Sequence, residues 1–222
     1  MKVLSSNAFR EALLALAPRF ERASGRKVEA QFIGGAELLR RLRGEERADL
    51  VILQRSAIEE LIGAGKLAAG SRADLAKSGI GIAVRKGARK PEAATGEALK
   101  RSLLAAKSVA VSSGPSGVYL LKLFERMGIP KERVVQTPPG VPAAGLVARG
   151  DAELGFQQVS EILPVPGVDY AGALPPEVQH YTVFSAGIHA GAQEPEAARA
   201  LMEFLVSGDA AGVVTEKGMD PC

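Results

Sequence analysis

The sequence predicts an α/β protein with two lobes, each built on a mainly parallel sheet flanked by helices. Three observations favour this fold class. Strand and helix patterns alternate along the chain almost without interruption, as they do in parallel sheets with crossover helices. Four strand-to-helix turns are rich in serine, glycine or proline. Two long β-type runs with small residues in their middle, at 79–84 and 181–188, are suited to link two lobes.

These two runs also predict where the lobes divide. If they lie side by side, the middle of the chain forms one lobe and its two ends form the other. We therefore expect a discontinuous lobe I of residues 1–81 plus 188–222, and a lobe II of residues 82–187. The two crossover strands would then act as a hinge, since glycine inside a strand permits a bend. The alternative is that both runs are ordinary central strands. With 222 residues, 46% of them hydrophobic, the chain is long enough for two small domains or one large one.

The first turn follows a strand expected near the N-terminus. Ser5, Ser6 and Asn7 lead into a helical pattern with apolar residues at positions 9, 13, 16 and 20. Serine and asparagine cap helix N-termini, where four amides without internal partners attract anions. Pro18 lies inside this pattern and predicts a kink or restart of the helix near residue 17.

The second turn consists of Gly34 and Gly35, between an alternating strand pattern at 28–33 and a helix with leucines at 38, 39 and 42. Glycine lets a ligand approach the backbone closely. A buried strand at 49–53, a short helix at 58–62 and the first linking strand are expected next.

The third turn contains Ser113, Ser116 and Gly117, between a strand at 109–111 and a helix that ends at residue 128. The fourth turn carries Val141, just before a proline suited to the first position of a helix at 143–149. Two further helices are expected, one starting near residue 195 and one at 210–217. Any α/β protein has such turns, but four of them, spread over both halves, favour a shared anion site.

Composition and motifs exclude several classes of function. The 28 basic and 25 acidic residues are interleaved and the net charge is +3, so the chain lacks a basic footprint for nucleic acid. Its only cysteine is Cys222, and His180 and His189 lie in a strand-like stretch, so we expect no disulfide, metal or cofactor. No run approaches the roughly 18 apolar residues that a membrane helix needs. Phosphate-binding, dinucleotide-binding and serine-nucleophile motifs are absent as well.

The N-terminus leaves the compartment open. After Met1 and Lys2 the chain enters its first strand at once, without the charged and apolar segments of a signal peptide. A periplasmic location is expected if a leader has been removed, and a cytoplasmic one if Met1 is the native start.

The order of the segments resembles the type II periplasmic solute-binding fold, in particular the molybdate-binding protein family. The resemblance covers essentially the whole chain, and the block ARGDAELGF is its most specific part. The matching segments are VLSSNAFREALLALAPRFE, ADLVIL, GIGIAVRKG, SGPSGVYLLKLFERMGI and VPAAGLVARGDAELGFQQVSE.

This resemblance implies a protein that captures a small anion in a cleft between its lobes for an ABC-type importer, with a permease as partner. Carried over residue by residue, it places the ligand near ten residues. These are Ser5, Ser6, Asn7, Gly34, Gly35, Ser113, Ser116, Gly117, Val141 and Gln157.

The chain departs from the molybdate-binding pattern at two places. The family usually has a serine in the second turn and a tyrosine after the strand of the last block, where this chain has Gly34-Gly35 and Gln157-Gln158. Two hydroxyl donors are thus missing, which argues against molybdate because each unmet polar group costs about 1 to 3 kcal/mol. The Gln157 amide both donates and accepts hydrogen bonds, which favours an organic carboxylate.

The resemblance also includes an aconitate isomerase, so an enzyme is the main alternative. Isomerisation of an unsaturated carboxylate needs a base that removes a proton and an acid that returns it elsewhere. Candidates are Tyr119, Glu161 and His189, although none belongs to a recognisable motif and His189 is equally suited to the surface. A cytosolic ligand sensor is a third interpretation.

Overall fold

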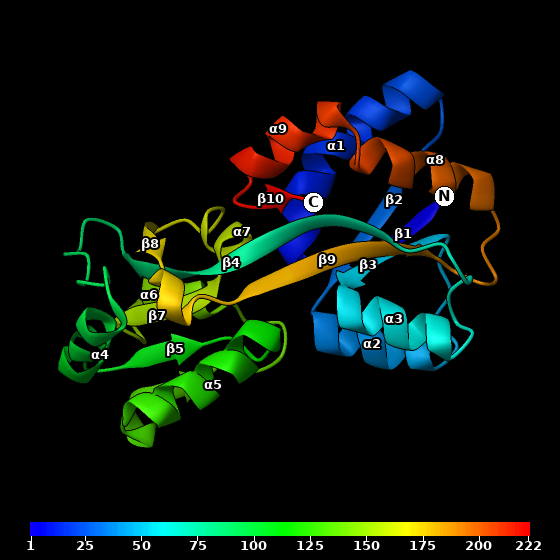
Figure 1. Cartoon of the computed structure of the whole chain (residues 1–222). Coiled ribbons are helices and arrows are strands. Elements are labelled where there is room, and N and C mark those ends of the chain that lie inside the picture. The colour runs from blue at the N-terminus through cyan, green and yellow to red at the C-terminus, as the bar shows by residue number, and fades with distance from the viewer. The chain divides into compact units, whose positions relative to one another are not determined.

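A computed structural model describes all residues, from Met1 to Cys222, and divides the chain into two compact units (Figure 1). Unit 1 consists of Met1–Ser78 and Thr182–Cys222, and unit 2 of Gly79–Tyr181. The second boundary between the units, after Tyr181, therefore lies earlier in the chain than the expected boundary after residue 187. The reason is pairing, because Phe184 to Ile188 run antiparallel to the strand Leu50–Gln54 of unit 1.

Unit 1 contains a sheet with the strand order β2-β1-β3-β9-β4. Its strands β1, β2 and β3 are parallel, with Ser6 opposite Ile33 and Ser5 opposite Ile52. The long strands β4 and β9 each contribute one part to this unit. The strand bounds are β1 Lys2–Ser6, β2 Glu29–Ile33, β3 Leu50–Gln54, β4 Ala73–Arg85, β9 Tyr181–Ile188 and β10 Asp220–Pro221, which pairs with β4.

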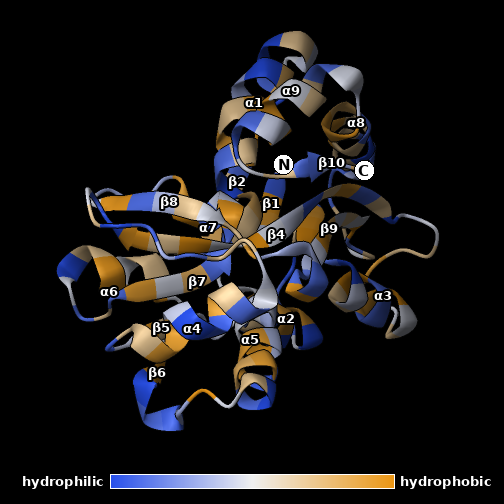
Figure 2. Ribbon diagram, turned by 60° about the vertical axis from the view of Figure 1, so that its left-hand side comes forward, coloured by the Kyte–Doolittle hydropathy of each residue, from blue (hydrophilic) through white to orange (hydrophobic).

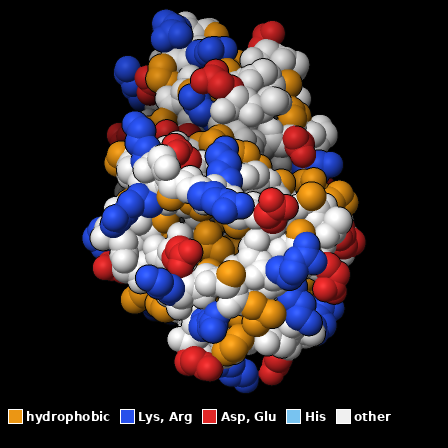
Figure 3. Space-filling model, turned by 90° about the vertical axis from the view of Figure 1, so that its left-hand side faces the viewer, with side chains coloured by type: hydrophobic (Ala, Val, Ile, Leu, Met, Phe, Trp, Pro, Cys, Tyr) orange, Lys and Arg blue, Asp and Glu red, His pale blue; other side chains and the backbone are white.

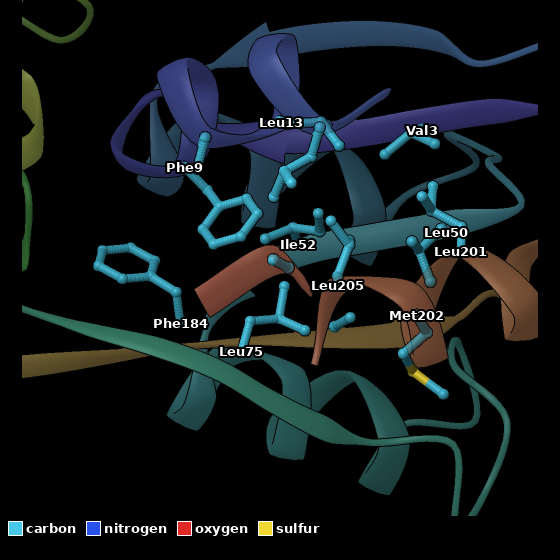
Figure 4. Packing of buried hydrophobic residues seen from close by; sticks show 14 of the residues in the cluster. Val3, Phe9, Leu13, Leu50, Ile52, Leu75, Phe184, Leu201, Met202 and Leu205 are labelled. Atoms are coloured by element: carbon cyan, nitrogen blue, oxygen red, sulfur yellow. The ribbon is translucent and has the colours of Figure 1, made fainter. Parts of the chain in front are cut away.

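Successive side chains along the strands of unit 1 point to opposite faces of the sheet, and each face packs against its own layer of helices. Ile52 of β3 joins a core with Leu13 and Leu205, and these three side chains point toward one another in Figure 4. Val51 and Leu53, on the opposite face, pack in a second core. Helices η1 Asn7–Phe9, α1 Arg10–Ser24, α8 Pro195–Leu205 and α9 Gly208–Glu216 supply the first core, and α2 Gly35–Arg43 and α3 Arg55–Gly63 the second.

Asp49 joins distant segments of unit 1. Its carboxylate accepts hydrogen bonds from the backbone amides of Lys2 (2.7 Å), Gln193 (2.7 Å) and Glu194 (2.9 Å). Burial raises the pKa of Asp49, but these amides outweigh burial and lower it overall. The carboxylate thereby holds the start of β1 and the N-terminus of α8 together.

Unit 2 contains a second sheet with the order β4-β7-β5-β6, in which β5, β6 and β7 are parallel and β4 and β8 pair antiparallel. Hydrophobic residues recur along its strands and helices (Figure 2). Val109 and Val111 face a core with α4 and α5, while Ala110 faces α6. The bounds are α4 Gly96–Ala105, β5 Val109–Val111, α5 Pro115–Met127, η2 Lys131–Arg133, β6 Val134–Gln136, α6 Ala143–Arg149, β7 Leu154–Gln158, α7 Val159–Ile162, β8 Val168–Ala173 and η3 Pro176–Val178.

The restart expected near residue 17 is wrong, because α1 continues from Arg10 to Ser24 with Pro18 inside it, and the alternative of a kink stays a prediction. Pro18 and Leu14, whose carbonyl would normally bond to residue 18, are both exposed. Water therefore has access to the carbonyl that lacks its helical partner, which reduces the cost of the proline.

Packing explains the glycines of the linking strands. A Cβ atom on Gly81 would lie 2.8 Å from Tyr170 in unit 2, and one on Gly187 would lie 2.8 Å from Leu67 in unit 1. Neither glycine has a positive φ angle. The lack of a side chain at both positions therefore serves close packing within each unit.

Surface charge is mixed. Figure 3 shows basic and acidic side chains interspersed over one face. Among the helices of the structure, none combines the length and the apolar character needed to cross a bilayer.

Candidate functional site

The parallel strands of unit 1 bring three turns to one edge of its sheet. β1 ends at Ser6, β2 leads to Gly34 and β3 ends at Gln54, and each of these residues directly precedes a helix. Because β1, β2 and β3 are parallel neighbours, their carboxyl ends lie at the same edge. Unit 1 thus groups the predicted residues Ser5, Ser6, Asn7, Gly34 and Gly35.

Ser6 differs from its neighbours in that its hydroxyl is unused. Its side chain is buried, and its Oγ has no hydrogen-bond partner. The Ser5 hydroxyl, by contrast, donates to the carbonyl oxygen of Ser6 (3.0 Å). A buried polar atom without a partner is uncommon and requires an explanation, of which a ligand is one.

Sequence reasoning missed Gln54 and Arg10 at this edge. A Cβ atom on Gly35 would lie 3.2 Å from Gln54 Oε1, so the carboxamide lies beside the glycine turn. The Arg10 guanidinium lies 5.0 Å from the ring centre of Phe32, which is opposite Ser5 in the sheet. An arginine held on an aromatic face supplies positive charge in a defined place. The position of Gln54, between a buried strand and a helix, was the available signal.

In unit 2 the third turn follows β5. The Oγ atoms of Ser112 and Ser116 are hydrogen-bonded (3.1 Å), and Ser116 is buried. A Cβ atom on Gly117 would lie 1.6 Å from the Ser112 carbonyl oxygen, so only glycine fits there. Ser113, in the same turn, is half-buried. The structure thus places the three predicted residues of this turn together.

Gln157 and Val141 lie near the start of α6. Buried Gln157 Oε1 accepts a hydrogen bond from the Ala144 amide (2.9 Å), which leaves its Nε2 donors for another group. The Val141 amide donates to the Pro138 carbonyl oxygen (3.1 Å), so it is engaged within its own turn.

Two further buried hydroxyls at this end of unit 2 were not predicted from the sequence. Thr137 directly follows β6 and Ser160 lies two residues after β7. Both are buried and neither Oγ has a hydrogen-bond partner. No sequence motif distinguishes them, because their burial depends on packing.

The three candidates for proton transfer differ in their surroundings. Burial raises the pKa of the Glu161 carboxyl to about 7. The Tyr119 hydroxyl donates to the Val178 carbonyl oxygen (2.9 Å), and its ring stacks on His180. Tyr119 is therefore already engaged, whereas Glu161 has the altered acidity that acid–base chemistry uses.

His189 lies at the amino end of β3, away from Ser6 and Gly34. Its amide donates to the Asp49 carbonyl oxygen (3.1 Å), and its Nδ1 accepts from Gly191 (3.0 Å). Burial, with nearby cationic side chains, lowers its pKa. This placement gives His189 a structural role and does not support the catalytic one.

The structure contains no group of three His, Cys, Asp or Glu side chains that could hold a metal ion. The polar atoms at the two edges are hydroxyls and amides, which suit an anion better than a cation.

Comparison with known proteins agrees with this fold. Residues 1–220 match the family model described as bacterial extracellular solute-binding protein. A relative named aconitate isomerase, from Pseudomonas sp, is 40% identical over 229 residues, covering 100% of this chain and 87% of the relative.

Solved structures of other proteins share the fold. The periplasmic molybdate-binding protein of Azotobacter vinelandii has a TM-score of 0.83 at 19% identity, covering 99% of this chain and 98% of that one. L-phospholactate-bound PEB3, a protein of Campylobacter jejuni, has a TM-score of 0.75 at 17% identity, covering 99% of both chains. The expected fold is thereby confirmed, and the chain belongs to the bacterial extracellular solute-binding protein family.

Proposed function

We propose that this protein binds a small organic polycarboxylate and delivers it to the permease of an ABC-type importer. The observation that carries the proposal is the buried Ser6 hydroxyl without a partner, at an edge that also holds the half-buried Gly34 and Gly35 and the cationic Arg10. Such an arrangement suits an anion that has several oxygen atoms. The 40% identical relative supports a carboxylate, because its name refers to a tricarboxylate.

The same residues argue against an inorganic oxyanion as the ligand. Gly34, Gly35 and Gln157 stand where molybdate binders of the resembling family carry hydroxyl donors. A tetrahedral oxyanion bound here would lack partners for some of its oxygens, at about 1 to 3 kcal/mol each.

A thermal-shift screen tests the proposal. Carboxylates of one to three charges are compared with molybdate, tungstate and sulfate, since a ligand that binds only the folded state raises the melting temperature according to its affinity. We expect shifts with trans-aconitate or a related polycarboxylate and little or none with the inorganic anions. A submicromolar molybdate affinity by calorimetry, with no carboxylate binding, would refute the proposal.

An isomerase is the second candidate, because Glu161 has a pKa of about 7 and the 40% identical relative is named aconitate isomerase. A carboxyl with this pKa is present in both protonation states near neutral pH, as a group that removes and returns a proton requires. In this candidate mechanism Glu161 takes a proton from the carbon next to the conjugated system and returns it at the other end of the allylic unit.

Proton NMR of trans-aconitate in D₂O separates the two candidates. An isomerase would form cis-aconitate with incorporated deuterium, and the Glu161→Gln variant would lose this turnover while it retains binding. A binding protein would shift its melting temperature with trans-aconitate and leave the compound unchanged.

A further inference from the structure

Thr137 has a buried side chain that the fold does not use. It is 2% exposed, and its Oγ1 has no hydrogen-bond partner. Its backbone amide does have a partner, because it donates to the Val111 carbonyl oxygen (2.9 Å). This bond extends the parallel pairing of β5 and β6 by one residue beyond Gln136. Thr137 therefore lies beside the carboxyl end of β5, with its backbone amide hydrogen-bonded to β5 and its hydroxyl without a partner.

Gln157 occupies the corresponding place on the other side of β5. The strand order is β7-β5-β6, and Val111 at the end of β5 pairs with Phe156 on one side and Gln136 on the other. Gln157 and Thr137 each follow these partners by one residue. Both residues thus flank Ser112, the first residue after β5.

The two side chains also share a face of the sheet. Side chains alternate along a strand, so residues 110, 137, 155 and 157 lie on the face opposite Val111. Ala110 packs with Ala143 and Val147 of α6, and a Cβ atom on Gly155 would lie 2.8 Å from Val147. Gln157 reaches the Ala144 amide on this same face. We place the Thr137 hydroxyl there by alternation.

Strand spacing sets the distance that a bound group would span. Neighbouring strands lie about 4.8 Å apart, so β6 and β7 are separated by about 10 Å across β5. One oxygen-bearing group above the end of β5 is within reach of a side chain from each flank. The available atoms are the Thr137 hydroxyl and the Gln157 Nε2, both of which donate hydrogen bonds.

We infer that Thr137 and Gln157 together bind one carboxylate of the ligand over the end of β5, with Thr137 as a specificity-determining residue. This inference rests on the proposed function and names the part of unit 2 that recognises the ligand. A carboxylate has two acceptor oxygens and therefore suits two donors from opposite sides. Bound carboxylate would also supply the partner that the buried Thr137 hydroxyl lacks.

The test compares Thr137→Val with Thr137→Ser, using trans-aconitate and citrate as probes in calorimetry. Valine keeps the shape and removes the hydroxyl, so we expect an affinity loss of roughly tenfold or more, on the loss of a hydrogen bond to a charged group. Serine keeps the hydroxyl and should retain most of the affinity. Thr215→Val, at an exposed position of α9, is the matched control and should bind as the wild type does.

Chemical denaturation supplies a readout that separates ligand binding from a structural role. Because the hydroxyl has no partner within the chain, Thr137→Val should leave the stability of the unliganded protein unchanged or raise it. A fall in stability with unchanged affinity would show that the hydroxyl serves the fold, and would overturn the inference.

The outcomes for the inference and for the proposed function remain distinct. If the wild type binds a probe and Thr137→Val binds it equally well, only the assignment of Thr137 is wrong, and ordered water then satisfies the hydroxyl. If the wild type binds no carboxylate at all, the proposed function fails and the inference fails with it.

Discussion

Ser5 and Ser6 are adjacent buried serines, and only one of their two hydroxyls has a partner within the chain. Ser5 donates to a backbone carbonyl, whereas the Ser6 hydroxyl has no partner within the chain. We expect Ser6→Ala to weaken carboxylate binding by roughly tenfold or more and to change stability little, because only the ligand uses this hydroxyl. Calorimetry and chemical denaturation measure the two effects.

Ser5→Ala provides the matched comparison for Ser6→Ala. This change removes the hydrogen bond to the Ser6 carbonyl, so it should lower the free energy of unfolding by about 0.5 to 1.5 kcal/mol. Equal effects of the two substitutions on affinity would show that Ser6 has no special role in binding.

Asp49 is the residue at which we expect a pH effect on stability. Its pKa is lower in the folded than in the unfolded protein, because three backbone amides donate to the carboxylate. The stabilisation is therefore complete above the unfolded pKa of about 3.9 and is lost as the pH falls through the folded value. Melting temperatures measured from pH 7 to pH 2 test this dependence.

Asp49→Asn removes the charge and leaves a side chain of similar shape. We expect it to lower stability at pH 7 by roughly 1 to 3 kcal/mol and to flatten the acid dependence. Glu45→Gln, at an exposed position, is the control and should follow the wild-type pH profile. An acid dependence that remains unchanged in Asp49→Asn would assign it to other carboxylates.

At the scale of elements, the turn from β5 into α5 depends on Gly117. A Cβ atom there would lie 1.6 Å from the Ser112 carbonyl oxygen, so Gly117→Ala must displace the helix from the strand. We expect a loss of several kcal/mol in stability, or failure to fold, as severe overpacking causes. Denaturation curves measure the loss.

Gly114→Ala is the matched control in the same turn. Its added Cβ atom would meet only the Ser112 Oγ, at 3.8 Å, and its φ of −81° is accessible to alanine. This variant should stay within about 1 kcal/mol of the wild type. Comparable losses in the two variants would mean that the turn is sensitive to any side chain.

The sequence predicted elements with a strong local pattern and missed those without one. The serine turns at Ser6 and Ser113 lie between clear strand and helix patterns, and the structure places them there. β6 was not predicted because it has only three residues. Val135 and Gln136 are exposed, so its sequence lacks the hydrophobic pattern of a buried strand. β8 and α4 were not predicted either. Thr137 was missed for a related reason, since its isolation depends on tertiary packing that no local motif encodes.

The whole molecule consists of two units that the chain joins twice, between Ser78 and Gly79 and between Tyr181 and Thr182. The hinge inferred from sequence stays a prediction. A rotation of one unit would confine changes in φ and ψ to these joins. We expect saturating trans-aconitate to lower the radius of gyration in small-angle scattering. Unchanged scattering, under conditions where calorimetry shows binding, would contradict the hinge.

The discontinuity of unit 1 has a consequence for synthesis on the ribosome. β9 lies between β3 and β4 in the strand order of unit 1, yet it is made after the whole of unit 2. Unit 2 is one continuous segment, so it has all its strands and helices before unit 1 receives its missing central strand. Until β9 has been made, β3 of unit 1 is unpaired on one side. Pairing of β3 with β9 is slow, because the two strands are far apart in the chain. The nascent chain therefore exposes an open sheet edge for much of its translation, and this interval is when chaperones would protect it from aggregation.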